Sequence, residues 1–347
     1  MRHVPEILDL SYTPSVFADT KDMPEHIWQS YRRQGIGGSD APIVTGQSPW
    51  NTPLGLYYDK LGIEPLHPEP KDEVPLKVGK RLEPLIAELF AAETGYTVYK
   101  DTNMYQHPLY PFMLVNLDYI SILPDGSKAI VECKSGSVYT EEAWADGRIP
   151  QHYLDQLRHE MCVMNMDKIF VAYLLGNSRK GFGIRTLTRD LARERELIRS
   201  EAAFWSHVET RVPPKLTHPD AELAFQVFNR YIESKAGAEV TLDPDSRGVL
   251  EQIIELNTKL SGLEKQKKEL DQQRKALYIR IAEQMGEAEA ARCGDITLTY
   301  KTSTRDGIDL GKLKAAYPEA YSACRRTSVS RTFRLHRPRT GEQEKAA

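Results

Sequence analysis

The sequence predicts a mixed α/β protein in which one main sheet is flanked by helices. Apolar residues at helical spacing alternate with short runs rich in strand formers through the first half of the chain, and a 3.5-residue apolar period follows in the second half. The length of 347 residues allows two or three domains. We expect a first domain over residues 1–212, a helical linker with one long helix over 213–290, and a basic region over 291–347.

The composition excludes several classes of protein. With 46 basic and 49 acidic residues the net charge is −3, which argues against a protein that coats nucleic acid over its whole surface but allows a local basic groove. No run of about 18 apolar residues suggests a membrane span, and the first residues lack an apolar signal segment. The four cysteines are scattered without a C-x-x-C pair, so neither a disulfide framework nor a cysteine zinc site is indicated. We therefore expect a cytoplasmic protein.

Three short helices are predicted near the N-terminus. Pro24 suits the first turn of one helix, which ends before the run Gly35-Ile36-Gly37-Gly38. Ser39-Asp40 is a candidate N-cap for a second helix, and residues 52–61 have helical spacing. Residues 64–75 carry four prolines among charges and predict a loop.

The following segment predicts a helix and then a hairpin. An amphipathic helix is indicated by Leu82, Leu85, Ile86, Leu89 and Phe90. Gly95 ends it, and residues 96–100 resemble a strand. Residues 112–123 and 128–134 predict two strands joined by a Pro-Asp-Gly-Ser turn. The other expected elements are a helix over 153–164, strands over 168–175 and 182–188, a short strand over 296–300 and a helix over 312–322.

The hairpin carries the most informative polar residues. Asp118 lies within an apolar run, where a charge is costly unless it is paired or binds a metal. Glu132 and Lys134 share one face of the next strand, and a hairpin can bring Glu132 beside Asp118. Two carboxylates about 4 Å apart repel by roughly 4 kcal/mol at an effective dielectric near 20. A divalent cation such as Mg²⁺ or Mn²⁺ removes that repulsion; the alternative is a simple salt bridge within the hairpin.

Two further features are weaker when taken alone. Glu83 flanks the apolar stripe of its helix, but helix spacing does not prefer it to Glu88 or Glu93 as a site residue. Arg32 and Ser39 flank a Gly-rich turn that leads into a helix N-terminus, which is typical of an anion site. The alternatives are a solvated carboxylate and an ordinary capped helix with a surface arginine.

Several motifs in order resemble a known nuclease core. They are Gly79-x-x-x-Glu83, Asn116-Leu117-Asp118, Glu132-Cys133-Lys134 and Tyr153-x-x-Gln156. This set resembles the restriction-endonuclease-like PD-(D/E)XK core and, more narrowly, the YqaJ-type viral recombinase family, which is related to phage-lambda-type exonucleases. The segments 32–41 and 46–50 are similar to the entry motif of that family. The resemblance covers about residues 31–190.

The resemblance implies a role for each matching residue. A Mg²⁺ or Mn²⁺ ion would be held by Asp118, Glu132 and the Cys133 carbonyl, with Glu83 completing the shell. Lys134 would orient or deprotonate the attacking water, Gln156 would steady it, and Arg32 and Ser39 would hold a terminal 5′-phosphate. Many members carry an aromatic residue four positions after the glutamine, where this chain has Glu160. Family branches with an iron–sulfur cluster need clustered cysteines, so no cluster is expected.

The implied function is a metal-dependent DNA exonuclease of phage-type recombination. It would act 5′→3′ from double-stranded ends in the cytoplasm of a bacterial host and leave 3′ single strands for a single-strand annealing protein. A homo-oligomer is compatible with the family, and no membrane is involved. Two alternatives are an endonuclease built on the same core and a non-catalytic protein that binds DNA ends or a partner.

The last third of the chain adds a helix and a basic region. The 3.5-residue period runs through Leu256, Leu260, Leu263, Leu270, Leu277 and Ile281, with Lys267 and Arg274 at two positions of the same seam. The helix either packs on its own chain or associates through a coiled coil. Residues 291–347 contain 12 basic and 6 acidic residues, and the candidate DNA contacts there are Arg325, Arg326, Arg331 and Arg334. The alternative is a solvated basic tail.

Overall fold

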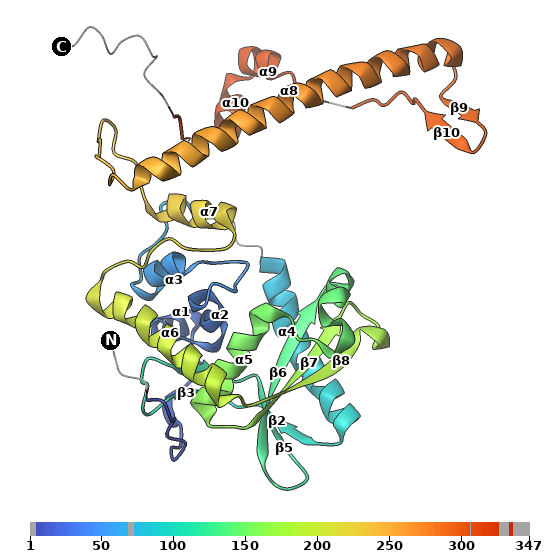
Figure 1. Cartoon of the computed structure of the whole chain (residues 1–347). Coiled ribbons are helices and arrows are strands. Elements are labelled where there is room, and N and C mark those ends of the chain that lie inside the picture. Colours follow the sequence, from blue (N-terminus) through green and yellow to red (C-terminus); the bar gives the residue numbers. More distant parts are fainter. Residues whose placement is uncertain (1–4, 69–72, 306, 326–332, 336–347) are drawn as a thin grey trace, which may run out of the picture. The chain divides into compact units, whose positions relative to one another are not determined.

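A computed structural model of the chain describes residues 5–68, 73–305, 307–325 and 333–335. It divides into two compact units, Met1–Ser234 and Lys235–Ala347. The first unit extends beyond the boundary expected at residue 212 because helix α7 (Ala221–Tyr231) packs on helix α3 (Pro53–Lys60), as Figure 1 shows. The Tyr231 ring stacks on Tyr58 with 4.4 Å between centroids.

A mixed five-stranded sheet forms the centre of the first unit. In order across the sheet the strands are β2 (Thr97–Tyr99), β5 (Tyr119–Ile122), β6 (Lys128–Gly136), β7 (Lys168–Leu175) and β8 (Phe182–Thr188). Neighbours are antiparallel except β6 and β7, which are parallel and are connected through the 3₁₀ segment η2 (Val138–Gly147) and helix α5 (Gln151–Met164). This mixed sheet with flanking helices confirms the predicted α/β class.

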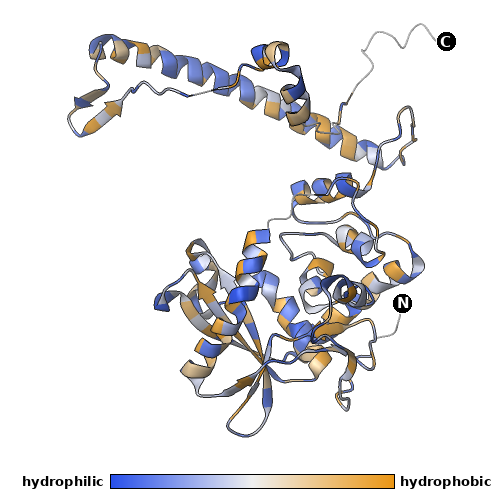
Figure 2. Ribbon diagram, turned by 180° about the vertical axis from the view of Figure 1, so that it is seen from behind, coloured by the Kyte–Doolittle hydropathy of each residue, from blue (hydrophilic) through white to orange (hydrophobic). Residues whose placement is uncertain are grey.

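Helices cover both faces of this sheet. Helix α4 (Glu73–Thr94) lies on one face, where Val131 shares a core with Phe90. Helix α5 lies on the other, where Ile130 shares a core with Leu157. Helix α6 (Leu191–Thr210) packs against α5, and η3 (Arg179–Gly181) precedes β8. Figure 2 shows the apolar strands between the two helical layers. The helix expected around residues 82–90 is thus the middle of a longer one that begins inside the predicted loop.

A second sheet meets the first at the apolar stretch 112–123. Its strands are β1 (Ser15–Asp19), β3 (Asn103–Gln106) and β4 (Leu114–Asn116), in the order β1-β3-β4. The prediction of one strand over 112–123 was wrong, because β4 pairs with β3 whereas β5 pairs with β2 and β6. Asp118 therefore lies at the junction where the chain passes from one sheet to the other, rather than inside a strand.

The Gly-rich segment is tied to this junction. It connects helix α1 (Glu25–Arg32) to the 3₁₀ turn η1 (Gly38–Asp40) and helix α2 (Ala41–Val44). The Ile36 N–H donates to the Phe112 carbonyl at 2.7 Å, and the Leu114 N–H donates to the Ile36 carbonyl at 2.8 Å. A Cβ on Gly35 would lie 2.6 Å from the Leu114 side chain, so only glycine allows this approach.

The second unit contains a long helix, a hairpin and two short helices. These are α8 (Ser246–Met285), the antiparallel pair β9 (Ala290–Cys293) and β10 (Ile296–Thr299), α9 (Leu310–Ala316) and α10 (Pro318–Cys324). The single helix expected over 312–322 was wrong, because Pro318 begins a new helix after a break at Tyr317. Among the helices in the described ranges, none combines the length and the apolar character needed to cross a membrane.

Candidate active site

The β5–β6 hairpin brings Asp118 to the backbone of β6. Tyr119 is the first residue of β5 and pairs with Val131, so the β6 groups beyond Val131 on that side lack a partner in β5. The Cys133 N–H instead donates to Asp118 Oδ2 at 2.9 Å. Because the N–H and C=O of one strand residue point to the same side of the strand, the Cys133 carbonyl faces Asp118 as well.

Glu132 and Lys134 project from the opposite face of β6 to Cys133 and meet helix α5 there. Lys134 Nζ donates to Glu132 Oε1 at 2.6 Å and to Gln156 Oε1 at 3.1 Å. Gln156 Nε2 donates to the same Glu132 oxygen at 2.7 Å. The Lys134 ammonium also lies 4.7 Å from the centre of the Tyr153 ring. The Gln156 amide is thus fixed in one orientation, with its oxygen toward the ammonium and its nitrogen toward the carboxylate.

Glu160 forms the back of this site. Its Oε1 accepts from Gln156 Nε2 at 2.9 Å, whereas its Oε2 is buried with no hydrogen-bond partner in the described part of the chain. The residue is only 1% exposed. Gly38 packs directly against it, since a Cβ there would lie 2.8 Å from Glu160 Oε1. We call Asp118, Glu132 and Glu160 the acidic cluster.

The electrostatics of the acidic cluster favour an added cation. Burial raises the pKa of Asp118 well above its usual value, and the neighbouring Glu132 and Glu83 carboxylates raise it further. Burial, reinforced by Glu132, also raises the pKa of Glu160 well above its ordinary range. Burial alone would lower the pKa of Lys134, but Glu132 and Asp118 raise it overall, so its amine stays protonated. The single ammonium of Lys134 does not balance the three carboxyl groups of the acidic cluster.

Glu83 comes from α4 and approaches Asp118 from the other side of the sheet junction. Its Oε1 accepts from Lys100 Nζ at 2.7 Å, and it lines a cavity of about 520 Å³ together with Asp118. Within the described ranges, no three His, Cys, Asp or Glu side chains are grouped as a metal site. Glu83 and Glu132 each already form an ion pair with a lysine. The donors that fit Mg²⁺ are therefore two carboxylates, Asp118 and Glu132, and one backbone carbonyl, all of them the oxygen ligands this ion prefers.

Arg32 and Ser39 meet across the Gly-rich turn. Arg32 Nη2 donates to Ser39 Oγ at 2.9 Å and to Asp40 Oδ1 at 3.0 Å, and the guanidinium lies 5.0 Å from the centre of the Trp28 ring. Asp40 does not cap α2 with its side chain, as the sequence had suggested for Ser39-Asp40, but binds Arg32. The arginine is thereby held with its side chain 27% exposed.

Lys60 is a part of this arrangement that the sequence did not indicate. Its Nζ, on a side chain only 1% exposed, donates to Asp40 Oδ2 at 2.6 Å and to the Arg32 carbonyl at 3.0 Å. Burial alone would raise the pKa of Asp40, but Lys60 and Arg32 hold it well below its usual range. We call Arg32, Asp40 and Lys60 the basic pocket; it has two cations for one carboxylate.

The basic pocket and the acidic cluster open into the same cavity. This cavity has a volume of about 190 Å³, and its wall includes Arg32, Gly37 and Ser39 on one side and Asp118, Glu132, Gln156 and Glu160 on the other. The tie between Ile36 and β4 accounts for this proximity, because it fixes the Gly-rich turn beside the sheet junction that carries Asp118. The Arg32 guanidinium and the acidic cluster are thus adjacent in one cavity.

Comparison with known proteins identifies the family of the chain. The family model described as "YqaJ-like viral recombinase domain" matches residues 27–167. A relative from Bacillus subtilis (strain 168), called "Uncharacterized protein YqaJ", is 31% identical over 325 residues, which span 92% of this chain and 96% of the relative. The chain belongs to the YqaJ-like viral recombinase family. The family match includes every residue of the basic pocket and the acidic cluster.

Solved structures also resemble parts of this YqaJ-like chain. The alkaline exonuclease LHK-Exo from Laribacter hongkongensis, crystallised in complex with dAMP, has a TM-score of 0.46 at 18% identity and covers 54% of this chain and 93% of its own. A phage-related exonuclease from Haemophilus somnus 129PT has a TM-score of 0.36 at 13% identity, with 51% and 96% covered. Both likenesses are weak.

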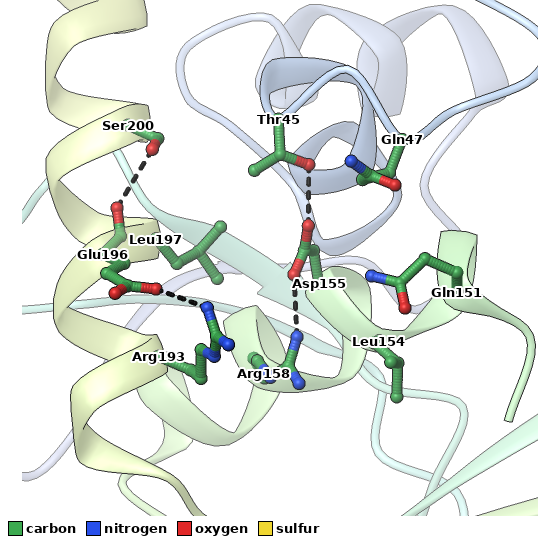
Figure 3. A pocket seen from close by; sticks show the side chains of 10 residues that line it. All are labelled: Thr45, Gln47, Gln151, Leu154, Asp155, Arg158, Arg193, Glu196, Leu197 and Ser200. Carbon is green, nitrogen blue, oxygen red and sulfur yellow. Dashed lines mark hydrogen bonds and ion pairs between the residues drawn. The ribbon is translucent and has the colours of Figure 1, made fainter. Parts of the chain in front are cut away.

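A separate cavity of the YqaJ-like unit lies on another side of α5. It has a volume of about 350 Å³ and is lined by residues of α5 and α6 and of the segment that follows α2 (Figure 3). Its charges compensate each other: Asp155 accepts from Arg158 at 3.0 Å, and Glu196 accepts from Arg193 at 2.9 Å. This cavity therefore lacks the charge imbalance of the one that holds the basic pocket.

The arginines expected to contact DNA near the C-terminus are only partly described. Arg325 and Arg334 are exposed in the second unit. Arg326 and Arg331 lie outside the described residues. Their contact with DNA remains a prediction from charge alone.

Proposed function

We propose that this chain is a Mg²⁺-dependent exonuclease that digests DNA 5′→3′ from double-stranded ends and leaves 3′ single strands. The observation that carries this proposal is the shared cavity, in which a partly exposed arginine and a hydroxyl lie next to buried and half-buried carboxylates. The basic pocket is suited to a terminal phosphate, because a guanidinium held by Asp40 can bind phosphate oxygens with little loss of side-chain freedom. Requiring that contact would direct cleavage to a strand end.

The acidic cluster supplies the donors for Mg²⁺, with Mn²⁺ as a substitute. Asp118, Glu132 and the Cys133 carbonyl would hold the ion, and Glu83 would join directly or through water once Lys100 releases it. A bound Mg²⁺ would lower the pKa of a water molecule and offset charge on the scissile phosphate.

Lys134 and Gln156 orient the reaction around these carboxylates. The protonated Lys134 amine donates to Glu132 and Gln156, so it can donate to a water or a phosphate oxygen when either enters the cavity. The Gln156 amide hydrogen-bonds both Glu132 and Lys134 and so holds these two side chains in place relative to each other. In this proposal Lys134 positions the attacking water, and Gln156 fixes the two groups on either side of it.

The experiment is digestion of linear duplex DNA with a Mg²⁺ titration, comparing 5′-phosphorylated and 5′-hydroxyl ends. We expect Mg²⁺-dependent release of nucleotides, faster from phosphorylated ends, and loss of the end preference in Arg32→Gln. Lys134→Met should lower the rate by at least 10²-fold, on the order expected for one preorganised contact in the transition state. Arg193→Gln in the charge-compensated cavity is the matched control and should behave as wild type.

Three outcomes would contradict the proposal. Equal rates on both kinds of end would remove the phosphate role of Arg32 and Ser39. Rapid nicking of covalently closed circles would favour an endonuclease on the same core. Binding of DNA ends without any metal-dependent cutting would favour a non-catalytic role.

A 3′ single-stranded product would give a single-strand annealing protein its substrate. We place both proteins in the cytoplasm of a bacterial host.

A further inference from the structure

Trp50 presents a large apolar ring to solvent close to the candidate active site. The residue is 64% exposed, whereas the other three tryptophans of the chain, Trp28, Trp144 and Trp205, are buried or half-buried. A single exposed apolar side chain is ordinary on a protein surface. Trp50 differs from an ordinary one in two respects, because the loop that carries it is held by several hydrogen bonds and because its ring is connected through other rings to Lys134.

The loop between α2 and α3 holds Trp50 through backbone hydrogen bonds. The N–H groups of Gln47 and Ser48 both donate to the Pro42 carbonyl, at 2.8 and 2.9 Å. The Ser48 carbonyl accepts from His218 Nε2 at 3.1 Å, and the Ser48 hydroxyl accepts from the Trp50 N–H at 3.2 Å. Ser48 itself is buried. The indole is therefore held in place before any ligand arrives, so that binding to it costs little loss of freedom.

A row of aromatic rings leads from Trp50 to the Lys134 ammonium. The Trp50 and His152 rings are 5.0 Å apart between centroids and nearly perpendicular, at 88°. The His152 ring lies 4.1 Å from the Tyr153 ring, whose centre is 4.7 Å from Lys134 Nζ. Burial lowers the pKa of His152, and the Lys134 ammonium lowers it further, so the His152 ring is neutral and within electrostatic range of Lys134. The Trp50 ring therefore lies at the edge of the site that contains Lys134.

Trp50 keeps at least one face of its ring open, unlike two other aromatic residues of the site. The Tyr153 ring faces the Lys134 ammonium, and Trp28, which lines the cavity, has a guanidinium 5.0 Å from its ring centre. In a perpendicular contact the edge of one ring meets the face of the other. His152 therefore covers at most one face of the Trp50 indole, in agreement with the high exposure of this residue.

The nuclease reaction proposed above requires the cleaved strand to leave its partner strand. The cavity that contains the acidic cluster has a volume of about 190 Å³, which is too small for both strands of a duplex. A phosphate that reaches Lys134 then belongs to an unpaired nucleotide, whose base has lost the stacking that it had in the duplex. An open aromatic face nearby restores stacking, and it accepts any base because every base has a π-face.

We propose that Trp50 stacks on an unpaired base of the DNA strand whose phosphate lies at Lys134. The ligand of this ring is thus single-stranded DNA, bound without regard to sequence. Trp50 contacts the substrate, and His152, which supports the indole from one side, is a positioning residue. The inference rests on the proposed function, since it takes a strand in the cavity as given. It adds a site for a base to the proposed sites for phosphate and metal.

Equilibrium binding in chelator tests the stacking contact without any cutting. The probe is a 5′-phosphorylated single-stranded oligonucleotide, compared with the same oligonucleotide in which the nucleotides next to the 5′ end are abasic, so that the phosphates remain and the bases are removed. We expect the wild type to bind the oligonucleotide with bases about fivefold more tightly or better, as one stacked base contributes. Trp50→Leu should bind both with the affinity that the wild type has for the abasic one. Trp50→Phe, which keeps a flat ring, should retain most of the difference.

The outcomes separate a stacking role from a structural one. If Trp50→Leu weakened binding of both oligonucleotides alike, the difference between them would persist, and Trp50 would act only through the shape of its loop. That result, or equal affinity of the wild type for both oligonucleotides, would overturn the stacking assignment. Mg²⁺-dependent digestion of duplex DNA is measured separately. Digestion without a preference for bases would refute the role of Trp50 alone, and a preference for bases without digestion would refute the nuclease assignment alone.

Discussion

The basic pocket and the acidic cluster are built from the same kinds of side chain but in opposite balance. In the basic pocket, Asp40 accepts from Lys60, Arg32 and a backbone N–H, so its carboxylate is fully paired. In the acidic cluster, the half-buried Asp118 and the buried Glu160 lie near a third carboxylate, Glu132, which pairs with Lys134, and one Glu160 oxygen has no hydrogen-bond partner among the described residues. The Asp40 carboxylate thus has all its partners within the protein, whereas the acidic cluster has more carboxyl groups than cations. The difference indicates that an added cation would fit the acidic cluster.

The largest expected effect is the loss of pairing in the basic pocket. Asp40→Asn leaves the Lys60 ammonium buried without its counter-charge, which should lower the free energy of unfolding by about 3–5 kcal/mol. Urea denaturation in chelator would measure it. Asp59→Asn, which removes an exposed partner of Arg33, is the control and should change stability by less than about 1 kcal/mol. A small effect of Asp40→Asn would mean that the pocket is not completed by this pair.

Whereas Asp40→Asn should lower the stability of the protein, a metal ion bound at the acidic cluster should raise it. A cation that binds only the folded state stabilises it by about 2.7 kcal/mol at a hundred times its Kd. We expect Mg²⁺ to raise the melting temperature of the wild type, and Asp118→Asn to remove most of that rise. In chelator, Asp118→Asn should melt higher than the wild type, since it removes a carboxylate that Glu132 and Glu83 oppose. Equal melting temperatures in both conditions would indicate a satisfied salt bridge instead.

The pH dependence of stability should report the uncompensated carboxyl directly. The folded-state pKa of Glu160 is raised, so the group contributes stability below its unfolded pKa, near 4.3, and that contribution is lost as the pH rises through its folded pKa. In chelator, wild type should therefore lose stability relative to Glu160→Gln as the pH is raised from 5 to 8. A constant difference across this range would show that Glu160 titrates normally.

The smallest effect is expected at the Ser39 hydroxyl, which accepts from Arg32 of the basic pocket. Ser39→Ala removes one acceptor from Arg32 and one donor for a terminal phosphate, which corresponds to about 1 kcal/mol or roughly fivefold in the preference for phosphorylated ends. Stability should be unchanged, because Ser39 is exposed. Competition between the two kinds of end in one digestion measures the preference. An unaltered preference would assign phosphate binding to Arg32 alone.

Local patterns predicted the hairpin, but not where the chain changes sheet. Alternation along residues 128–134 and the turn before them were enough to bring Asp118 close to β6. The run 112–123 contains no glycine or proline, and so gives no local signal that β4 and β5 belong to different sheets. That division is decided by which strands pair with each other, since β4 pairs with β3 and β5 with β2 and β6.

Tertiary contacts also decide the parts of the site that the sequence missed. Lys60 occupies the last turn of α3, where a lysine ordinarily favours the helix dipole and stays in solvent. Its burial depends on Asp40, twenty residues earlier, and on a carbonyl of α1. In the sequence, Glu160 stood out only because many family members carry an aromatic residue at that position. Its contact with Gly38 follows from the packing of α5 against η1. Neither residue has a spacing signal of its own.

The bond between Ile36 and the start of β4 has a consequence for the length of the product. From Met113, where the Gly-rich turn is attached, a short extended run leads to Asp118, so in the proposed function this run would set the distance between the bound strand end and the metal site. Two residues inserted within it would keep the alternation of side chains and add about 7 Å. That is about two base-pair steps of duplex DNA. In the proposed function, the size of each released fragment would then depend on the length of this extended run.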